Sequence, residues 1–208
     1  MADESVPTPI GEAGISWFRP ADAARAVMVL GHGTATGVEA GDLQAIAAAL
    51  PPIGIAVALV TQPYRLNGGR GSDEPSLDLA WKSVWPKVAD ARVPVIAGGR
   101  SAGSQVACRT ARDLGAVAVL ALAYPLLGPG SPRELLATGL PTLIVQGTND
   151  PFGQPAQFPP LPPSFEMVEV PSGNHMFGVP AGTATDTVAP LAIVTSAVVR
   201  WVETLLPL

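Results

Sequence analysis

The chain has 208 residues and a formal net charge of -5, and it is rich in apolar residues (48%) but poor in charged ones (14%). An average soluble protein carries roughly 25% charged residues, so most of this chain is expected to be core or small-residue packing. The acidic balance, without runs of Lys or Arg in the sequence, argues against nucleic acid and anionic membrane surfaces as partners. A single cysteine excludes an internal disulfide and a cysteine metal cluster.

The length predicts one domain over residues 1–208, because domains usually hold about 100–200 residues. The sequence begins with the acidic and polar segment Met1–Glu4, and no apolar stretch follows it. This pattern predicts neither a signal peptide nor a membrane anchor, and it favours a cytoplasmic location. The sequence carries no signal for an oligomeric state.

Apolar runs and helical stretches alternate along the chain. Weak runs at residues 6–10 and 15–18 come first and are expected to pair as antiparallel strands at one sheet edge. Stronger runs follow at residues 26–30, 54–60, 93–97, 116–122, 142–145 and 165–170. Stretches of helical character lie between them, at residues 41–50, 77–91, 102–114, 131–138 and 187–205. The alternation predicts a three-layer α/β fold with a mostly parallel sheet of about seven to eight strands and helices on both faces.

Two connections bear on access to any site at the edge of this sheet. The segment 124–131 is short and leaves no room for a cap domain, which predicts an open site. Prolines exclude a regular helix from residues 151–163, so that segment is expected to be an ordered loop. Its apolar residues offer the alternative of a lid over the site: Phe152, Phe158 and Leu161.

The strongest motif is Gly99-Arg100-Ser101-Ala102-Gly103, a G-x-S-x-G pattern between an expected strand and an expected helix. A serine at such a sharp turn needs a strained backbone, and Gly99 and Gly103 remove the side chains that would clash there. Ser101 is therefore the candidate nucleophile. Ordinary turn chemistry is the alternative for the motif alone. Arg100 either holds the turn or meets an anionic substrate.

Two further residues complete a set that can activate a serine. His175 follows the last expected strand, in the loop where a catalytic base belongs, and Asp150 follows the strand before it. Either residue alone would be read as an ordinary surface or turn residue. The order Ser, Asp, His is the order of one fold class of serine hydrolases, so we expect Asp150 to orient His175.

The segment His32-Gly33-Thr34 follows the first strong apolar run, where this type of fold supplies an oxyanion donor. We expect the backbone N–H groups of Thr34 and Ala102 to form the oxyanion hole, and His32 to hold the loop by hydrogen bonds rather than to carry protons. The nearby side chains Tyr64 and Arg65 are expected to line the substrate pocket.

A dinucleotide site is the competing interpretation of Gly31-His32-Gly33. A G-x-G-x-x-G fingerprint would place its third glycine at position 36, which is Thr36, and no acidic residue ends the next strand. Because the fingerprint is incomplete and the sequence shows no clustered set of His, Cys and carboxylate ligands, neither a cofactor nor a metal is expected. Cys108 is expected to pack in the core.

On the motifs around Ser101, Asp150, His175 and His32-Gly33, the chain resembles the α/β-hydrolase superfamily over nearly its whole length. The strand-to-helix turn that carries Ser101, at residues 99–103, is called the elbow below. The compact form of the chain and the run Gly98-Gly99-Arg100-Ser101 at the start of the elbow resemble the cap-less dienelactone-hydrolase-like group. The resemblance implies cofactor-free hydrolysis of a small-molecule ester, and the open site favours short acyl groups. Dienelactone hydrolases use a Cys nucleophile, and dehalogenases and epoxide hydrolases of this fold require an Asp, so Ser101 argues against those reactions. A non-catalytic binding scaffold is the second hypothesis, because related compact domains occur as parts of larger complexes.

Overall fold

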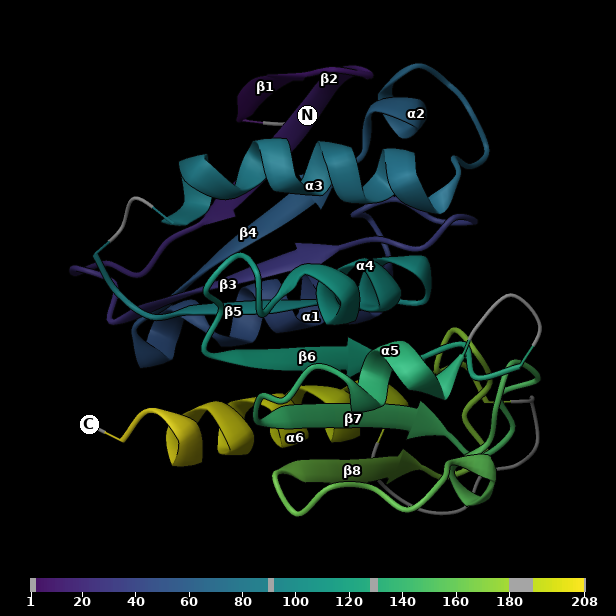
Figure 1. Ribbon diagram of the computed structural model, residues 1–208. Coiled ribbons are helices and arrows are strands. Elements are labelled where there is room, and N and C mark those ends of the chain that lie inside the picture. Colours follow the sequence, from purple (N-terminus) through teal and green to yellow (C-terminus); the bar gives the residue numbers. More distant parts are fainter. Residues whose placement is uncertain (1–2, 90–91, 128–130, 180–188, 208) are drawn as a thin grey trace.

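The computed structural model describes residues 3–89, 92–127, 131–179 and 189–207 (Figure 1). Within these residues, eight strands form one sheet in the order β1-β2-β4-β3-β5-β6-β7-β8. The first two strands pair antiparallel, β2 pairs antiparallel with β4, and all other pairs are parallel. The strands are β1 (Glu4–Thr8), β2 (Gly11–Phe18), β3 (Ala26–Gly31), β4 (Ile55–Thr61), β5 (Val95–Arg100), β6 (Ala118–Leu122), β7 (Thr142–Gly147) and β8 (Phe165–Val170).

Six α-helices occur in the described residues: α1 (Gly41–Ala49), α2 (Pro63–Leu66), α3 (Glu74–Val88), α4 (Ala102–Thr110), α5 (Pro132–Leu136) and α6 (Pro190–Leu205). Helix α3 begins three residues earlier than predicted because the Asp73 side chain caps it, accepting a hydrogen bond from the Ser76 amide at 3.0 Å. Residues 90–91 and 187–188 of two predicted helices lie outside the described residues.

Helices cover both faces of the sheet, as predicted (Figure 1). Alternate residues of β3 show how the two layers form, because Val27 and Val29 pack into one core while Met28 and Leu30 pack into the other. The first core includes buried residues of α3, α4 and α5, and the second includes those of α1 and α6. The three-layer α/β prediction is confirmed.

Strand β5 runs further than the sequence predicted, since it continues from residue 97 through Gly98 and Gly99 to Arg100. Glycine is needed here for close packing rather than for a turn. A Cβ on Gly99 would lie 2.6 Å from the Gly103 carbonyl carbon and 2.7 Å from the Gly31 carbonyl oxygen. Because Gly99 has no side chain, Gly103 at the start of α4 can lie directly against the ends of β3 and β5.

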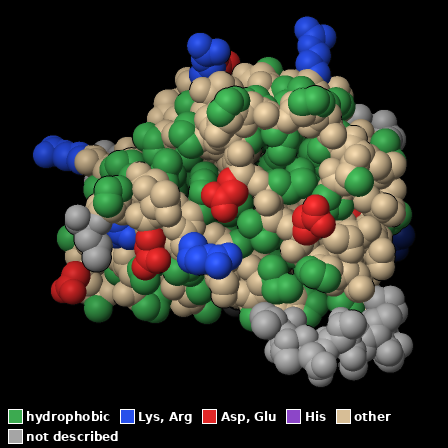
Figure 2. All heavy atoms as spheres, turned by 90° about the horizontal axis from the view of Figure 1, so that it is seen from below, with side chains coloured by type: hydrophobic (Ala, Val, Ile, Leu, Met, Phe, Trp, Pro, Cys, Tyr) green, Lys and Arg blue, Asp and Glu red, His purple; other side chains and the backbone are tan. Residues whose placement is uncertain are grey.

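Strand β1 is shifted relative to the predicted run at residues 6–10. It ends at Thr8, whose hydroxyl donates to the Gly11 carbonyl at 2.6 Å and closes the turn into β2. At the opposite edge of the sheet lies β8, and Figure 2 shows the molecule from that side, with apolar side chains over much of the face. Glu166 and Glu169 of β8 are exposed, and charges on an edge strand oppose pairing with a second chain.

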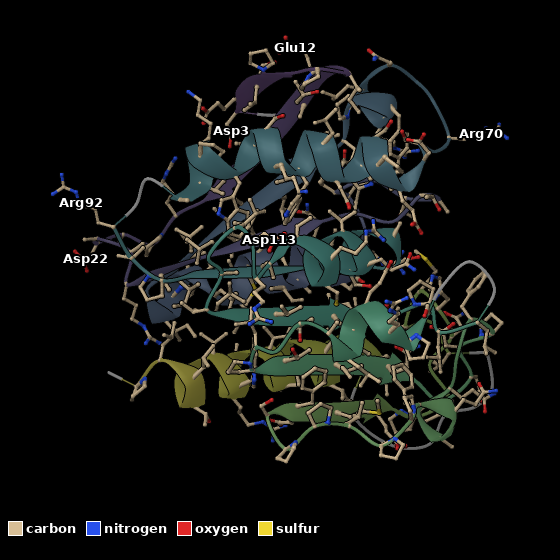
Figure 3. All side chains as sticks on the ribbon, viewed as in Figure 1. Asp3, Glu12, Asp22, Arg70, Arg92 and Asp113 are labelled. Atoms are coloured by element: carbon tan, nitrogen blue, oxygen red, sulfur yellow. The ribbon has the colours of Figure 1, made fainter. Side chains whose placement is uncertain are left out.

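Most charged side chains point into solvent, as the labelled residues of Figure 3 illustrate. Buried exceptions include Arg100 and Asp42, whose side chains are 1% and 2% exposed. Both lie near the carboxyl ends of the parallel strands, which is where ligand sites form in open α/β sheets.

Candidate active site

Ser101 stands between β5 and α4 in a strained backbone conformation. Its φ is 51° and its ψ is -123°, a combination that non-glycine residues rarely adopt and that costs of order 1–3 kcal/mol. The Ser101 amide donates to the Leu122 carbonyl of β6 at 2.9 Å, which fixes the turn to the neighbouring strand. The turn places the hydroxyl at the N-terminus of α4, whose free N–H groups favour negative charge.

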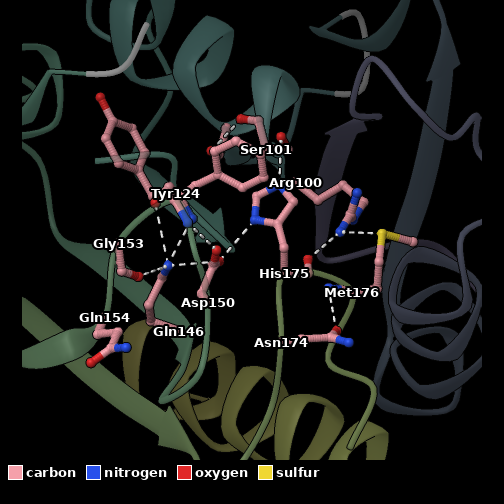
Figure 4. A network of polar contacts seen from close by, with 12 residues as sticks. Arg100, Ser101, Tyr124, Gln146, Asp150, Gly153, Gln154, Asn174, His175 and Met176 are labelled. Atoms are coloured by element: carbon pink, nitrogen blue, oxygen red, sulfur yellow. Dashed lines mark hydrogen bonds and ion pairs between the residues drawn. The ribbon is translucent and has the colours of Figure 1, made fainter. Parts of the chain in front are cut away.

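The three residues of the expected catalytic set lie in hydrogen-bonding contact (Figure 4). His175 Nε2 is 2.9 Å from Ser101 Oγ, and His175 Nδ1 is 2.8 Å from Asp150 Oδ2. Because the ionised Asp150 can only accept, Nδ1 carries the proton and Nε2 is free to accept from the serine hydroxyl. The Asp150 side chain is fully buried, whereas that of His175 is 16% exposed.

Gln146 of β7 holds Asp150 in place, a role that sequence reasoning missed. Its Nε2 donates to Asp150 Oδ2 at 2.9 Å and to the Gly153 carbonyl at 2.7 Å, while its Oε1 accepts from the Tyr124 amide at 2.8 Å (Figure 4). The Phe152 amide donates to Asp150 Oδ1 at 2.8 Å. A glutamine directly after the apolar run at residues 142–145, and four residues before the candidate acid, was the available signal.

Arg100 connects the elbow to the loop that carries the candidate base. Its Nη2 donates to the His175 carbonyl at 2.6 Å, and its Nε pairs with Asp42 of α1 at 2.9 Å. Nη1 reaches the Thr36 hydroxyl at 3.3 Å, and Nη2 also lies 3.2 Å from Met176 Sδ. Of the two roles considered for Arg100, the contacts favour holding the elbow over binding an anionic substrate.

The loop expected to supply an oxyanion donor lies against the elbow. A Cβ on Gly33 would lie 3.1 Å from Ser101 Cβ, so glycine permits this approach. Thr34 and Ala102 line the same cavity as Ser101. In the part of the chain that the structure describes, the backbone N–H groups of Thr34 and Ala102 donate to no protein acceptor. Both remain candidates for the oxyanion hole.

His32 lies behind this loop and is held by two backbone groups. Its Nδ1 donates to the Gly33 carbonyl at 2.8 Å, and its Nε2 accepts from the Gln62 amide at 3.0 Å. Burial lowers the pKa of His32 below its ordinary value, which favours this neutral form. With both ring nitrogens engaged, His32 has no nitrogen left for proton transfer at Ser101.

Tyr64 and Arg65 do not line the cavity over Ser101, contrary to the prediction from the sequence. The Tyr64 hydroxyl donates to the Gly33 carbonyl at 3.3 Å and its ring meets His32 edge-on at 5.7 Å between centroids. Arg65 pairs with Glu39 at 2.8 Å. Neither residue is part of the cavity lining, and both lie on α2, a short helix that the sequence did not predict.

The cavity over Ser101 has a volume of about 340 Å³ and opens to solvent. Phe152 forms one wall, with its ring centroid 4.6 Å from that of His175. The alternative of a lid built from three apolar side chains is not supported, because Phe158 and Leu161 pack against the core instead. The remaining lining includes Leu77, Gln105, Arg109, Pro125 and Met176.

Other candidate chemistries lack a site in the described residues. Cys108 is buried, and burial raises the pKa of its thiol far above the usual range, so it is a poor nucleophile. No group of three or more His, Cys, Asp or Glu side chains among these residues is arranged to hold a metal ion. None of the helices described is long and apolar enough to cross a membrane.

Comparison with known proteins now decides the family. Residues 24–203 match the family model described as an alpha/beta hydrolase domain. The chain belongs to this family. A search of curated protein sequences finds no match for this α/β-hydrolase.

Solved structures agree with the α/β-hydrolase fold. XC6422 from Xanthomonas campestris, a serine hydrolase without a lid, superposes with a TM-score of 0.78 at 18% identity, covering 99% of this chain and 94% of that one. Dienelactone hydrolase from Anabaena variabilis gives 0.72 at 20% identity, covering 97% and 95%. Est1E from Butyrivibrio proteoclasticus, solved with ferulic acid, gives 0.72 at 14% identity, covering 96% and 99%. At these identities the likeness establishes the fold, and the predicted resemblance to cap-less α/β-hydrolases is confirmed.

Proposed function

We propose that this α/β-hydrolase is a serine esterase that cleaves small-molecule carboxylic esters with short acyl groups through an acyl-enzyme intermediate. The observation that carries the proposal is the continuous hydrogen-bonded line from Ser101 Oγ through His175 to Asp150, at 2.9 and 2.8 Å. The proposal takes residues 1–208 as a single catalytic domain.

In the acylation step, His175 Nε2 takes the hydroxyl proton as Ser101 Oγ bonds to the ester carbonyl carbon. The buried Asp150 stabilises the imidazolium that forms. The N–H groups of Thr34 and Ala102 would bind the oxyanion, each contributing about 3–4 kcal/mol to the transition state. When the carbon–oxygen bond breaks, His175 returns the proton to the departing alcohol. Water repeats these steps on the acyl-enzyme, and no cofactor takes part.

Cavity size supports a preference for short acyl groups. A volume of about 340 Å³ lies at the small end of ligand sites, which span roughly 300–1,000 Å³. Each buried methylene contributes roughly 0.8 kcal/mol, and the gain stops where the chain passes the rim. On p-nitrophenyl esters we expect kcat/KM to peak at about two to six acyl carbons and to level off or fall beyond. A steady rise to sixteen carbons would contradict the size argument.

Reaction with a fluorophosphonate probe tests the proposal. Intact mass should show one adduct on the wild-type chain, none on Ser101→Ala, and one on Ser83→Ala, a matched control at a half-buried serine of α3. Circular dichroism would establish that each protein is folded. A folded wild-type chain that forms no adduct and hydrolyses no ester would favour the alternative of a non-catalytic binding scaffold.

A further inference from the structure

Gln105 is a polar side chain at the cavity with no role in the proposed triad. It follows Ser101 by one turn of α4, so both residues lie on the same face of the helix. The residue is 7% exposed and contributes to the cavity lining. Its Nε2 has no hydrogen-bond partner among the described residues. A buried amide left unpaired costs about 1–3 kcal/mol, so its place beside a nucleophile points to a ligand.

The Gln105 amide is free to adapt to such a ligand. Within the described residues neither its nitrogen nor its oxygen is engaged in a side-chain hydrogen bond. Because Nε2 is itself buried, it can donate to a ligand in the cavity only after rotation about the last side-chain bond, which exchanges the two ends of the amide and breaks no such hydrogen bond. Residues one helical turn apart lie about 6 Å apart, so the partner group would stand a few bonds from the reacting carbonyl.

The charges further along α4 restrict what that group can be. Arg109, one turn beyond Gln105, also lines the cavity, but its guanidinium binds Asp78 at 2.8 Å and Glu134 at 3.2 Å, with Glu74 at 3.8 Å. One cation thus faces three carboxylates, and Glu74 itself lines the cavity. Burial raises the pKa of Glu134, although the adjacent Arg109 opposes the shift.

Arg100 is the other cation in the lining, and its charge is also already paired with a carboxylate. It is paired with Asp42, and both side chains are buried. Neither arginine therefore offers an unpaired face to a substrate carboxylate, and a carboxylate placed near Glu74 would meet repulsion. A neutral group avoids that repulsion and can still accept a hydrogen bond from an amide.

We propose that the substrate is an uncharged ester with a hydrogen-bond acceptor a few bonds from its scissile carbonyl, and that Gln105 donates to that acceptor. The inference rests on the proposed esterase function. It makes Gln105 a specificity residue and makes anionic esters poor substrates.

The test compares esters that differ by one atom. p-Nitrophenyl 4-methoxybutanoate and p-nitrophenyl hexanoate have acyl chains of equal length, with an ether oxygen in place of one methylene. 3-Methoxypropyl acetate and pentyl acetate form the same pair on the alcohol side. For one of the two pairs we expect wild-type kcat/KM to favour the ether about three- to tenfold, the range of one neutral hydrogen bond. This ratio should fall to one or below in both Gln105→Leu and Gln105→Met. Gln44→Leu, at an exposed glutamine of α1, should keep it.

A second comparison tests the charge argument. The monoanionic p-nitrophenyl hydrogen glutarate should be cleaved at least about tenfold more slowly than the hexanoate, and Glu74→Gln should reduce this penalty. Active enzyme that shows no ether preference in either pair, or that keeps the preference in the Gln105 variants, would overturn the inference alone. Absence of fluorophosphonate labelling and of all ester hydrolysis would instead overturn the proposed function, and the inference with it.

Discussion

The buried ion pair between Arg100 and Asp42 makes a quantitative prediction. Nε and Oδ2 lie 2.9 Å apart, and the two side chains are 1% and 2% exposed. Asp42→Asn removes the compensating charge and leaves the guanidinium buried, which typically costs about 3–5 kcal/mol. Total stabilities are about 5–15 kcal/mol, so the loss is a large part of the free energy of unfolding. For a chain of this size it corresponds to a fall in Tm of roughly 6–20 °C.

Urea denaturation followed by circular dichroism would measure this loss. The matched control is Glu39→Gln, which breaks an ion pair of similar length whose side chains are 34% and 65% exposed, and it should cost less than about 1 kcal/mol. The double variant Asp42→Leu with Arg100→Met should regain most of the stability. The kcat of this double variant should be lower than that of the wild-type protein, because it lacks the Arg100 guanidinium that donates to the His175 carbonyl. Equal costs for Asp42→Asn and Glu39→Gln would refute the reasoning.

Three further predictions concern titratable or nucleophilic side chains. His175→Ala should lower kcat about a thousandfold or more with little change in Tm, whereas an equal kcat loss in His32→Ala at unchanged Tm would reverse the two roles. Burial lowers the pKa of His32 in the folded chain, so as pH falls below about 6.5 the unfolded chain takes up the His32 proton before the folded chain does. Tm should therefore fall with acidification, and it should fall less steeply in His32→Gln. Burial raises the pKa of Cys108, so a thiol reagent at pH 8 should label it only after urea is added, and rapid labelling of native protein would contradict its burial.

The sequence was sufficient to predict the sheet and the residues that meet at its edge. Apolar runs of strand length and their order along the chain decide the layers, and parallel strands bring their carboxyl ends to one edge. Ser101, Asp150 and His175 each follow such a strand, so local position was enough to place them in one region. Their catalytic roles remain a proposal.

Contacts between distant segments could not be predicted in the same way. Tyr64 and Arg65 lie shortly after β4, yet they belong to a short helix and do not line the cavity. The roles of Gln146 and Arg100 depend on partners from other loops, and a sequence pattern does not specify such partners. Phe152 lines the cavity and its amide donates to Asp150, whereas Phe158 and Leu161 of the same loop pack against the core.

The contacts of Arg100 have a consequence for refolding. The residue binds groups of α1, the oxyanion loop and the segment after β8, and its neighbour Ser101 is fixed to β6. The site therefore joins parts of the chain that are far apart in sequence, and it cannot assemble before most strands are in place. During refolding from urea, fluorophosphonate labelling of Ser101 should appear with the last and slowest phase of the circular dichroism signal. The rate of labelling would then report when the sheet is complete.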